Sequence, residues 1–322
     1  MNIRLTDLGE HNIKRKLIND VIRKYFENYE YGDATYIEID NKLLVTSCDG
    51  YVGSSWLLPF MTWEDVGWKV CSTTISDILV KLARPIQVLV SINIEGHRLY
   101  SELESIILGI CKFCKEHNIL LGKLDLNESS EFSISACAIG LGTRVIGNII
   151  RGRCVLYTVP EFGYTGIVFK LLELNKLWEY YNEPIVRKGV EILRRPRPPV
   201  YMLELSEDIV SGVEASTDSS DGLGAVLWSF AENSKCTVRV VDAPVPEEVV
   251  DFCRDLKLSV EEVVFNGAEE YLPVIALREN VGELKVGDVK FVPFAYAEPS
   301  DSARVIYGGR VLAYRGWEYF RR

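Results

Sequence analysis

The sequence contains few of the residues on which several common enzyme chemistries depend. Only three histidines occur among 322 residues, His11, His97 and His117, so catalysis by a histidine base has little material to work with. There is no phosphate-binding loop ending in Gly-Lys-Ser/Thr and no protein-kinase catalytic loop. No apolar run approaches the length of a membrane span. The common nucleotide-binding loops and histidine-based catalysis are therefore not supported by the sequence.

Basic residues are outnumbered as well. The chain has 36 Lys and Arg against 46 Asp and Glu, a net charge of -10, which argues against a nucleic-acid or anionic-membrane surface. A phosphate-containing substrate stays compatible with this charge if metal ions lie between the two. Residues 1–17 are too polar for a signal peptide, so we expect a cytoplasmic protein.

Cysteine occurs in moderate number but in no metal-binding pattern. Cys111 and Cys114 are the one close pair, in a segment of helical periodicity where residues three apart share a face. No second Cys or His pair stands at zinc-ligand spacing. We expect buried thiols, and a disulfide stays open as an alternative. The eight cysteines are Cys48, Cys71, Cys111, Cys114, Cys137, Cys154, Cys236 and Cys253.

The length of the chain and its hydrophobic pattern predict a mixed α/β protein of two domains, residues 1–150 and 151–322. Asp125 is expected in a turn, and the Arg- and Pro-rich segment 194–199 is expected to be a stiff surface linker. The periodicity predicts helices over 11–26, 63–82, 100–116, 166–181 and 223–231, and strands within 34–48, 88–94, 132–140, 154–159, 212–217 and 236–241.

The segment Thr217 to Leu223 carries the strongest chemical signal. Its acids Asp218 and Asp221 lie where a predicted strand gives way to a predicted helix, a place where backbone N–H groups point outward and favour anions. Two carboxylates there are understandable if a divalent cation joins them to a phosphate. The alternative is ordinary helix capping by Ser220 or Asp221.

Four further acids lie at similar junctions of predicted elements, namely Asp33, Asp49, Asp77 and Asp125. Taken singly, each has an ordinary explanation: a turn residue for Asp33 and Asp125, a hairpin signal for Asp49 before Gly50, and a solvated or capping group for Asp77. Only their combination with Asp218 and Asp221 suggests a metal site.

Six short motifs follow one another along the chain. They are Gly32-Asp33-Ala34, Ser47-Cys48-Asp49, Asp65 to Asp77, Thr217 to Leu223, Gly267 to Tyr271 and Tyr314 to Trp317. Together they resemble the signature of thiamine-monophosphate kinases, in the superfamily of aminoimidazole ribonucleotide synthetase, selenophosphate synthetase and the hydrogenase maturation dehydratase. The resemblance covers nearly the whole chain, and the Ser-Asp-Gly-Leu block at 220–223 is its most specific part.

The resemblance implies a two-domain α/β (α+β) fold of the aminoimidazole-ribonucleotide-synthetase type. The N-terminal domain would bind ATP and Mg²⁺ and would pair its sheet with that of a second chain, giving a barrel in a homodimer. The implied reaction is direct transfer of the γ-phosphate of ATP to thiamine monophosphate, which yields thiamine diphosphate. Such a transfer depends on positioning and charge neutralisation more than on a nucleophile, in keeping with the scarcity of histidine.

The resemblance also assigns roles to residues. Asp218 and Asp221 would be catalytic, and Glu269 and Trp317 would face the thiamine-like acceptor, with the indole stacked on a cationic ring. The ATP site would include Asp33, Ser47, Cys48, Asp125 and Ser220. The Mg²⁺ ligands would be Asp33, Asp49, Asp77, Asp125, Asp218 and Asp221.

Two departures from the family pattern keep alternatives open. Ala34 replaces the second acid of the family's Gly-Asp-Asp, and the turn at Asp125 has an extra residue. A relative with another acceptor, such as an aminoimidazole ribonucleotide synthetase, is one alternative. A nucleotide-binding protein without catalysis is the other.

Overall fold

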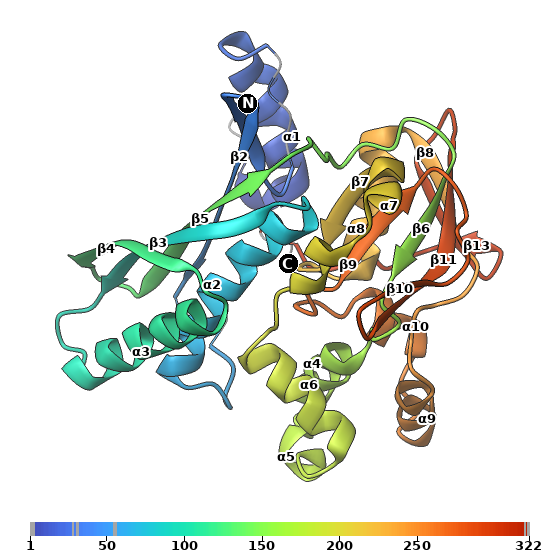
Figure 1. The fold of residues 1–322 in the computed structure, drawn as a ribbon. Helices are drawn as coiled ribbons and strands as arrows, with labels where there is room; N and C mark the ends of the chain where they lie inside the picture. Colours follow the sequence, from blue (N-terminus) through green and yellow to red (C-terminus); the bar gives the residue numbers. More distant parts are fainter. Residues whose placement is uncertain (1–3, 28, 30–31, 54–56, 319, 321–322) are drawn as a thin grey trace.

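The computed structural model describes residues 4–27, 29, 32–53, 57–318 and 320. Within these residues the strands form two separate sheets, a five-stranded sheet in the N-terminal half and an eight-stranded sheet in the C-terminal half (Figure 1). Helices pack on both sheets, which confirms the expected mixed α/β fold.

The N-terminal sheet has the strand order β1-β2-β5-β3-β4, with β3 and β4 parallel and the other neighbours antiparallel. Helices α2 and α3 lie together on one of its faces (Figure 1). The elements of this half are η1 (Leu5–Asp7), α1 (Glu10–Asp20), η2 (Ile22–Lys24), β1 (Thr35–Ile39), β2 (Lys42–Val52), α2 (Trp63–Val80), β3 (Arg84–Ile94), α3 (Tyr100–Glu116), β4 (Leu120–Glu128) and β5 (Ser133–Gly142).

Helix α2 is the central helix of the molecule, because every residue from Asp65 to Val80 is buried. A helix enclosed on all sides must contact neighbours all round, and α2 contacts the N-terminal sheet, α3, α6 and strand β7 of the second sheet. It crosses α3 at two glycines. A Cβ on Gly67 would lie 1.9 Å from the carbonyl oxygen of Ile106, and a Cβ on Gly109 would lie 2.0 Å from that of Glu64.

The alternation of side chains along the N-terminal strands gives its sheet an inner and an outer face. On β5, Ile134, Ala136 and Ala138 are buried against α2, whereas Cys137 between them is exposed on the face away from the helices. The register carries this division to the other strands, so Asp49 lies opposite Ala136 on the inner face. Along each strand, successive residues face opposite sides of the sheet.

The C-terminal sheet has the order β13-β12-β8-β11-β6-β9-β7, with β10 paired to β11. Its core includes buried residues of β6, β9 and α8. The elements are β6 (Cys154–Thr158), α4 (Tyr164–Glu173), α5 (Leu177–Tyr180), α6 (Pro184–Arg194), η3 (Val200–Glu204), α7 (Glu207–Gly212), β7 (Val213–Asp218), α8 (Leu223–Ser234), β8 (Cys236–Val240), α9 (Glu247–Asp255), α10 (Val260–Phe265), β9 (Pro273–Leu277), β10 (Leu284–Val286), β11 (Val289–Pro299), β12 (Arg304–Tyr307) and β13 (Arg310–Val311).

Three expectations about local structure are wrong. Asp125 lies inside strand β4 and not in a turn. The helix expected over 166–181 divides into α4 and α5, since Asn175 between them adopts a left-handed φ of 55°. The helix expected over 11–26 ends as α1 at Asp20 and continues as the 3₁₀ turn η2.

Segment 194–199 is also not a surface linker, because it docks onto α2. The guanidinium groups of Arg194 and Arg195 pair with the buried carboxylate of Asp65 at 2.9 and 2.8 Å. The carbonyl oxygen of Pro196 accepts hydrogen bonds from Trp68 Nε1 at 3.1 Å and Ser72 Oγ at 2.7 Å. These contacts fix the second half of the chain against the central helix.

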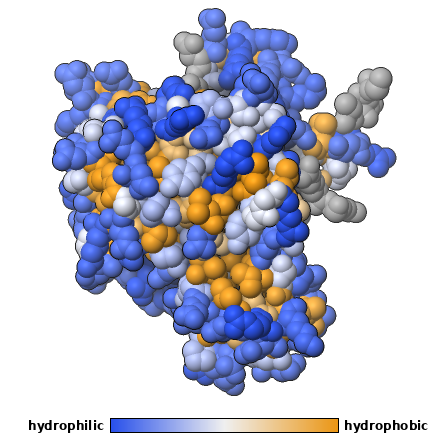
Figure 2. Space-filling view, turned by 90° about the vertical axis from the view of Figure 1, so that its right-hand side faces the viewer, coloured by the Kyte–Doolittle hydropathy of each residue, from blue (hydrophilic) through white to orange (hydrophobic). Residues whose placement is uncertain are grey.

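The surface carries apolar patches interrupted by charged side chains, as Figure 2 shows for one face. Scattered apolar residues are normal on soluble surfaces. Among the described residues, none of the helices combines the length and the hydropathy that crossing a bilayer requires.

We predict that Gly67→Ala lowers the free energy of unfolding by about 1–3 kcal/mol, because the added methyl group meets backbone atoms of α3 that cannot rotate away. Gly152→Ala is the matched control, since a Cβ there meets nothing within 4 Å. Denaturant unfolding of both variants measures the difference. Equal stability of the two would contradict the close approach of α2 and α3.

Candidate functional site

Five of the predicted acids come together where the N-terminal sheet, α2 and the turn between β7 and α8 meet. Their carboxyl groups interact electrostatically with one another: the pKa of Asp77 is raised by burial and then by three of the others. Like charges so placed oppose one another's ionisation. We refer to this group as the carboxylate cluster; it consists of Asp33, Asp49, Asp77, Asp218 and Asp221.

Asp77 and Asp218 form the buried centre of the cluster, with 9% and 4% of their surface exposed. Ser47 Oγ donates to Asp77 Oδ2 at 2.5 Å, and the hydroxyl of Ser76 donates to Asp218. Burial raises the pKa of Asp77 well above its usual range, and burial together with Asp33 raises the pKa of Asp218 to about 7. Two hydroxyl donors thus do not offset the cost of burying these charges.

Asp49 and Asp221 lie at the edge of the cluster beside helix α1. Burial, followed by the charge of Glu10, raises the pKa of Asp221 to about 7, while Lys14 acts in the opposite direction. Burial and the charge of Asp33 raise the pKa of Asp49. The contribution of α1 was not foreseen, because Glu10 and Lys14 belong to an amphipathic surface pattern.

A buried lysine beside the cluster is the main residue that sequence reasoning missed. The Nζ atom of Lys81 lies 2.8 Å from Asp33 Oδ2 and also donates to Asn148 and to the carbonyl oxygen of Ser216. Asn148 in turn donates to Asp33 at 3.0 Å. A signal was present, since Lys81 is a single charge in the apolar run 78–83, one helical turn after Asp77.

The turn at 218–222 is held by backbone contacts and not by helix capping. The N-cap of α8 is Gly222, at φ 95°, with no side-chain capping bond, so the capping alternative for Ser220 and Asp221 is wrong. A Cβ on Gly222 would lie 2.1 Å from the carbonyl oxygen of Gly267. Ser220 N donates to Asp218 Oδ1 at 3.3 Å, and Glu269 N donates to the carbonyl oxygen of Ser220 at 2.8 Å.

The two neighbouring acids Glu269 and Glu270 have different environments. Glu269 pairs with the fully buried Lys69 of α2 at 2.7 Å and retains 19% of its side-chain exposure. Glu270 is 5% exposed, accepts a hydrogen bond from Gly163 N at 2.6 Å, and has its pKa raised to about 8 by burial. Glu269 therefore lies on the α2 side, whereas Glu270 supports the start of α4.

Trp317 lies next to the carboxylate cluster. Its backbone N–H donates to the carbonyl oxygen of Asp221 at 3.0 Å, and its side chain is 47% exposed. The preceding Gly316, at φ 75°, permits this approach, because a Cβ there would lie 2.2 Å from the same oxygen. The indole is thus anchored beside the cluster and still has surface available.

The side chains of Asp125 and Cys48 are not brought to the cluster. Asp125 is paired in register with Ser91 and through it with Ser135, which places it on the outer face of the sheet. There its carboxylate lies 3.2 Å from Lys123 Nζ and accepts from Asn127. Cys48 also points outward, because it lies one position from both Ser47 and Asp49 on β2.

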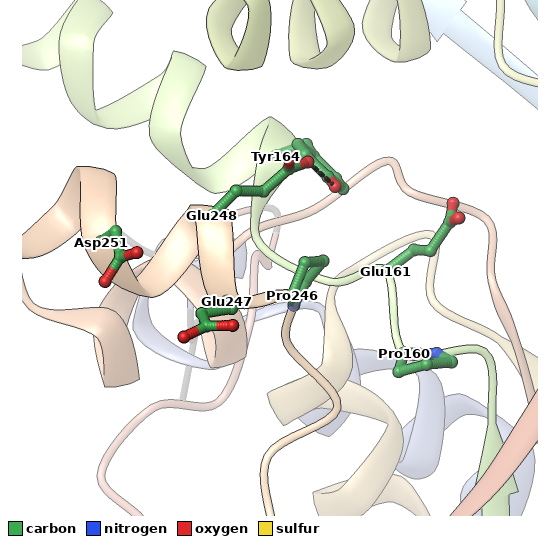
Figure 3. Close-up of a pocket in the computed structure, with 7 residues that line it drawn as sticks. All are labelled: Pro160, Glu161, Tyr164, Pro246, Glu247, Glu248 and Asp251. Atoms are coloured by element: carbon green, nitrogen blue, oxygen red, sulfur yellow. Dashed lines mark hydrogen bonds between the residues drawn. The ribbon is translucent and has the colours of Figure 1, made fainter.

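A separate open pocket of about 590 Å³ lies between the start of α4 and helix α9. Its lining is acidic, and the hydroxyl of Tyr164 donates to Glu248 across it (Figure 3). No residue predicted for the site lines this pocket. We therefore assign it no part in nucleotide binding.

The chemistry of the carboxylate cluster suits a hard divalent cation. All five donors are carboxylates, the ligand type that Mg²⁺ prefers. Burial raises the pKa values of Asp77, Asp218 and Asp221, so a bound cation would stabilise their charged forms. Over the described part of the chain, no three carboxylate, imidazole or thiol groups converge closely enough to hold a metal as they stand. The residues present fit Mg²⁺ by donor type and charge, but not by their spacing in this structure.

The chain is similar to several known proteins. Residues 31–142 match the family described as AIR synthase related protein, N-terminal domain. The thiamine-monophosphate kinase of Pyrobaculum calidifontis is 33% identical over 292 residues, covering 91% of each chain. That of Pyrococcus abyssi is 27% identical over 308 residues, covering 94% of each chain.

The fold is similar to that of a solved structure as well. AaThiL complexed with AMPPCP and TMP aligns with a TM-score of 0.83 over 99% of both chains, at 22% identity. The sequence match over nine-tenths of the chain and the shared fold lead to one conclusion. The chain belongs to the thiamine-monophosphate kinase family.

Proposed function

We propose that this protein transfers the γ-phosphate of ATP directly to the phosphate of thiamine monophosphate and so forms thiamine diphosphate. The observation that carries the proposal is the carboxylate cluster, a buried group of like charges at the junction of the two sheets. Kinship with thiamine-monophosphate kinases supplies the reaction and the substrate. Alignment with a structure bound to AMPPCP and TMP is consistent with it.

Mg²⁺ would be held by Asp33, Asp49, Asp77, Asp218 and Asp221. When bound there it would neutralise phosphate charge and screen the repulsion between two anionic substrates. We keep Asp218 and Asp221 as the catalytic pair, since they share one rigid turn and both titrate near neutral pH. Ser47 and Ser220, which flank this group, are proposed to lie along the ATP phosphates.

Lys81 is proposed to position the one acid that remains in the Gly32-Asp33-Ala34 motif. Ala34 is buried in the N-terminal core, so Asp33 is the one acid of its motif, and the ammonium group of Lys81 holds it in place. A fixed positive charge costs no reorganisation when phosphate charge develops. We therefore propose that the loss of the second acid leaves the site competent.

The thiamine moiety is proposed to lie between Glu269 and Trp317. The backbones of both residues are held against the turn at 218–222, because Glu269 N donates to the carbonyl oxygen of Ser220 and Trp317 N donates to that of Asp221. A partly exposed indole can stack on the cationic thiazolium ring. The carboxylate of Glu269, fixed by Lys69, would add an opposite charge.

We further propose that two chains associate through the outer face of the N-terminal sheet, with residues 1–150 as the ATP-binding and dimerisation domain and residues 151–322 as the second domain. The helices lie on the other face (Figure 1), and exposed apolar side chains mark this one: Ile37, Ile39, Val52 and Leu141. Such a surface favours burial against a partner. Asp125 lies on the same face, so it would point toward the partner and not toward its own cluster.

The direct test is to incubate the purified protein with Mg-ATP and thiamine monophosphate and to detect thiamine diphosphate by mass spectrometry. We expect product that depends on Mg²⁺, and a loss of at least about 100-fold in kcat for Asp221→Asn, since one ligand charge disappears without a change of shape. Asp251→Asn, which makes the same change in the open acidic pocket, should retain full activity.

Two results would contradict the proposal. One is a folded, ATP-binding protein that yields no thiamine diphosphate. The other is normal turnover by Asp221→Asn, which would remove Asp221 from the metal site.

The raised pKa of Asp221 predicts how the stability of the metal-free protein depends on pH. The unfolded carboxyl titrates near 3.8 and the folded one near 7, so between these values the folded chain retains a proton that the unfolded chain has released. Stability contributed by this group therefore falls as the pH rises from 4 to 7. In EDTA, Asp221→Asn should be about 2–4 kcal/mol more stable than the natural protein at pH 8 and nearly equal to it at pH 4. A difference that stays constant across this range would be inconsistent with the assigned burial.

Glu269 and Glu270 are predicted to differ in their effect on the acceptor. Glu269→Gln should raise the KM for thiamine monophosphate about tenfold, whereas Glu270→Gln should leave kinetics nearly unchanged, because a group with a pKa of about 8 is already largely neutral. Steady-state kinetics measures both.

The double variant Lys69→Met/Glu269→Gln separates two explanations for Glu269. If Glu269 serves only to pair Lys69, removing both partners restores the KM. If Glu269 contacts the acceptor, the KM stays raised. If Glu270→Gln raised the KM more than Glu269→Gln, the family motif would be aligned one residue out of position.

A further inference from the structure

Cys48 and Cys137 form a pair of thiols on the outer face of the N-terminal sheet. They are directly opposite each other on the antiparallel strands β2 and β5, and their Sγ atoms lie 3.1 Å apart. Both residues are exposed in the single chain. Neither has a place in the proposed phosphate transfer, since their side chains point away from the carboxylate cluster.

The backbone geometry suits a disulfide without rearrangement. Residues directly opposite in an antiparallel pair have Cα atoms about 4.5–5.5 Å apart, within the range of about 4.4–6.8 Å that disulfides span. The sulfur atoms need to approach by about 1 Å to reach the bond length of about 2.05 Å, a movement that side-chain rotation supplies. The strand pairing on both sides of the pair stays as it is.

We propose that Cys48 and Cys137 are a disulfide site, oxidised within one chain by a peroxide. One thiolate attacks a peroxide oxygen and becomes a sulfenic acid as water leaves; the second thiolate then attacks the sulfenic sulfur and displaces a second water. The two thiols lose two protons and two electrons, and hydrogen peroxide is reduced to two molecules of water. The bond can form in the single chain before the outer face is covered by a partner.

The position of the bond gives it a structural consequence. It closes a loop between positions 89 residues apart that contains α2, β3, α3 and β4, and hence Asp77 on α2. Cross-linking a long loop restricts the unfolded chain and so stabilises the folded one. Ser47 and Asp49, which flank Cys48 on β2 and face inward, belong to the site. The bond would therefore fix the strand that carries them.

Other cysteines of the same domain provide internal comparisons. Cys71 and Cys114 also contact each other, but both are buried between α2 and α3, where an oxidant reaches them only after unfolding. Cys111 is exposed on α3 and has no exposed cysteine opposite it. Oxidation of the folded protein should therefore link one pair selectively.

The test treats the fully reduced protein with hydrogen peroxide at a dilution where gel filtration shows a single chain, alkylates the remaining thiols and maps the peptides by mass spectrometry. We expect a peptide pair joining Cys48 to Cys137, migration as a single chain on a non-reducing gel, and a thermal midpoint raised by at least about 5 °C. Cys111→Ser should behave in the same way. Cys48→Ser and Cys137→Ser should lose both the linked peptide and the rise in midpoint.

Two outcomes would overturn the proposal: both cysteines remain fully alkylated after peroxide, or Cys48 is linked to a second chain. Should a serine variant fail to fold, the oxidised and reduced natural protein still give the comparison. The mapping does not use catalysis, so a missing disulfide and a missing kinase activity are separate results.

Discussion

The arrangement of this molecule depends on one electrostatic constraint, the burial of several carboxylates in one place. Asp77 and Asp218 are almost fully enclosed, and the pKa values of both are raised. Burying like charges lowers the free energy of unfolding, and the packing of a core does not by itself require such charges. The structure supplies part of the relief itself, through Lys81 on Asp33 and hydroxyl donors on the two central acids. A divalent cation and a phosphate would supply the rest.

The two halves of the chain are assembled around this constraint by α2. The helix contributes Asp77 to the cluster and Lys69 to Glu269, and Lys81, directly after its last residue, pairs with Asp33. Asp65 near its start holds the arginines of segment 194–199. Its charged groups therefore connect the N-terminal sheet with two separate parts of the C-terminal half. Because the helix is enclosed, movement of either half would disturb these pairs, and the site is consequently held between rigid elements.

Much of this could be predicted from the sequence, and the misses have physical reasons. Asp218 and Asp221 were identifiable because a strand-to-helix junction with two acids is a local pattern. The sequence could not show that Asp125 faces away from the cluster, since the face on which it lies depends on its register with β3, a long-range pairing. Lys81 was missed because its partners are distant in sequence. The Pro-rich segment 194–199 has the composition of a linker, and only tertiary contacts with Trp68 and Ser72 place it against α2.

Proton release on Mg²⁺ binding tests the central claim most directly. Calorimetric titration of the metal-free protein with Mg²⁺, in buffers of different ionisation enthalpy, counts the protons that leave. If Asp218 and Asp221 titrate near pH 7 and bind the metal, binding at pH 6.5 should release more protons than binding at pH 8.5. Absence of Mg²⁺ binding, or binding at pH 6.5 without proton release, would contradict the account.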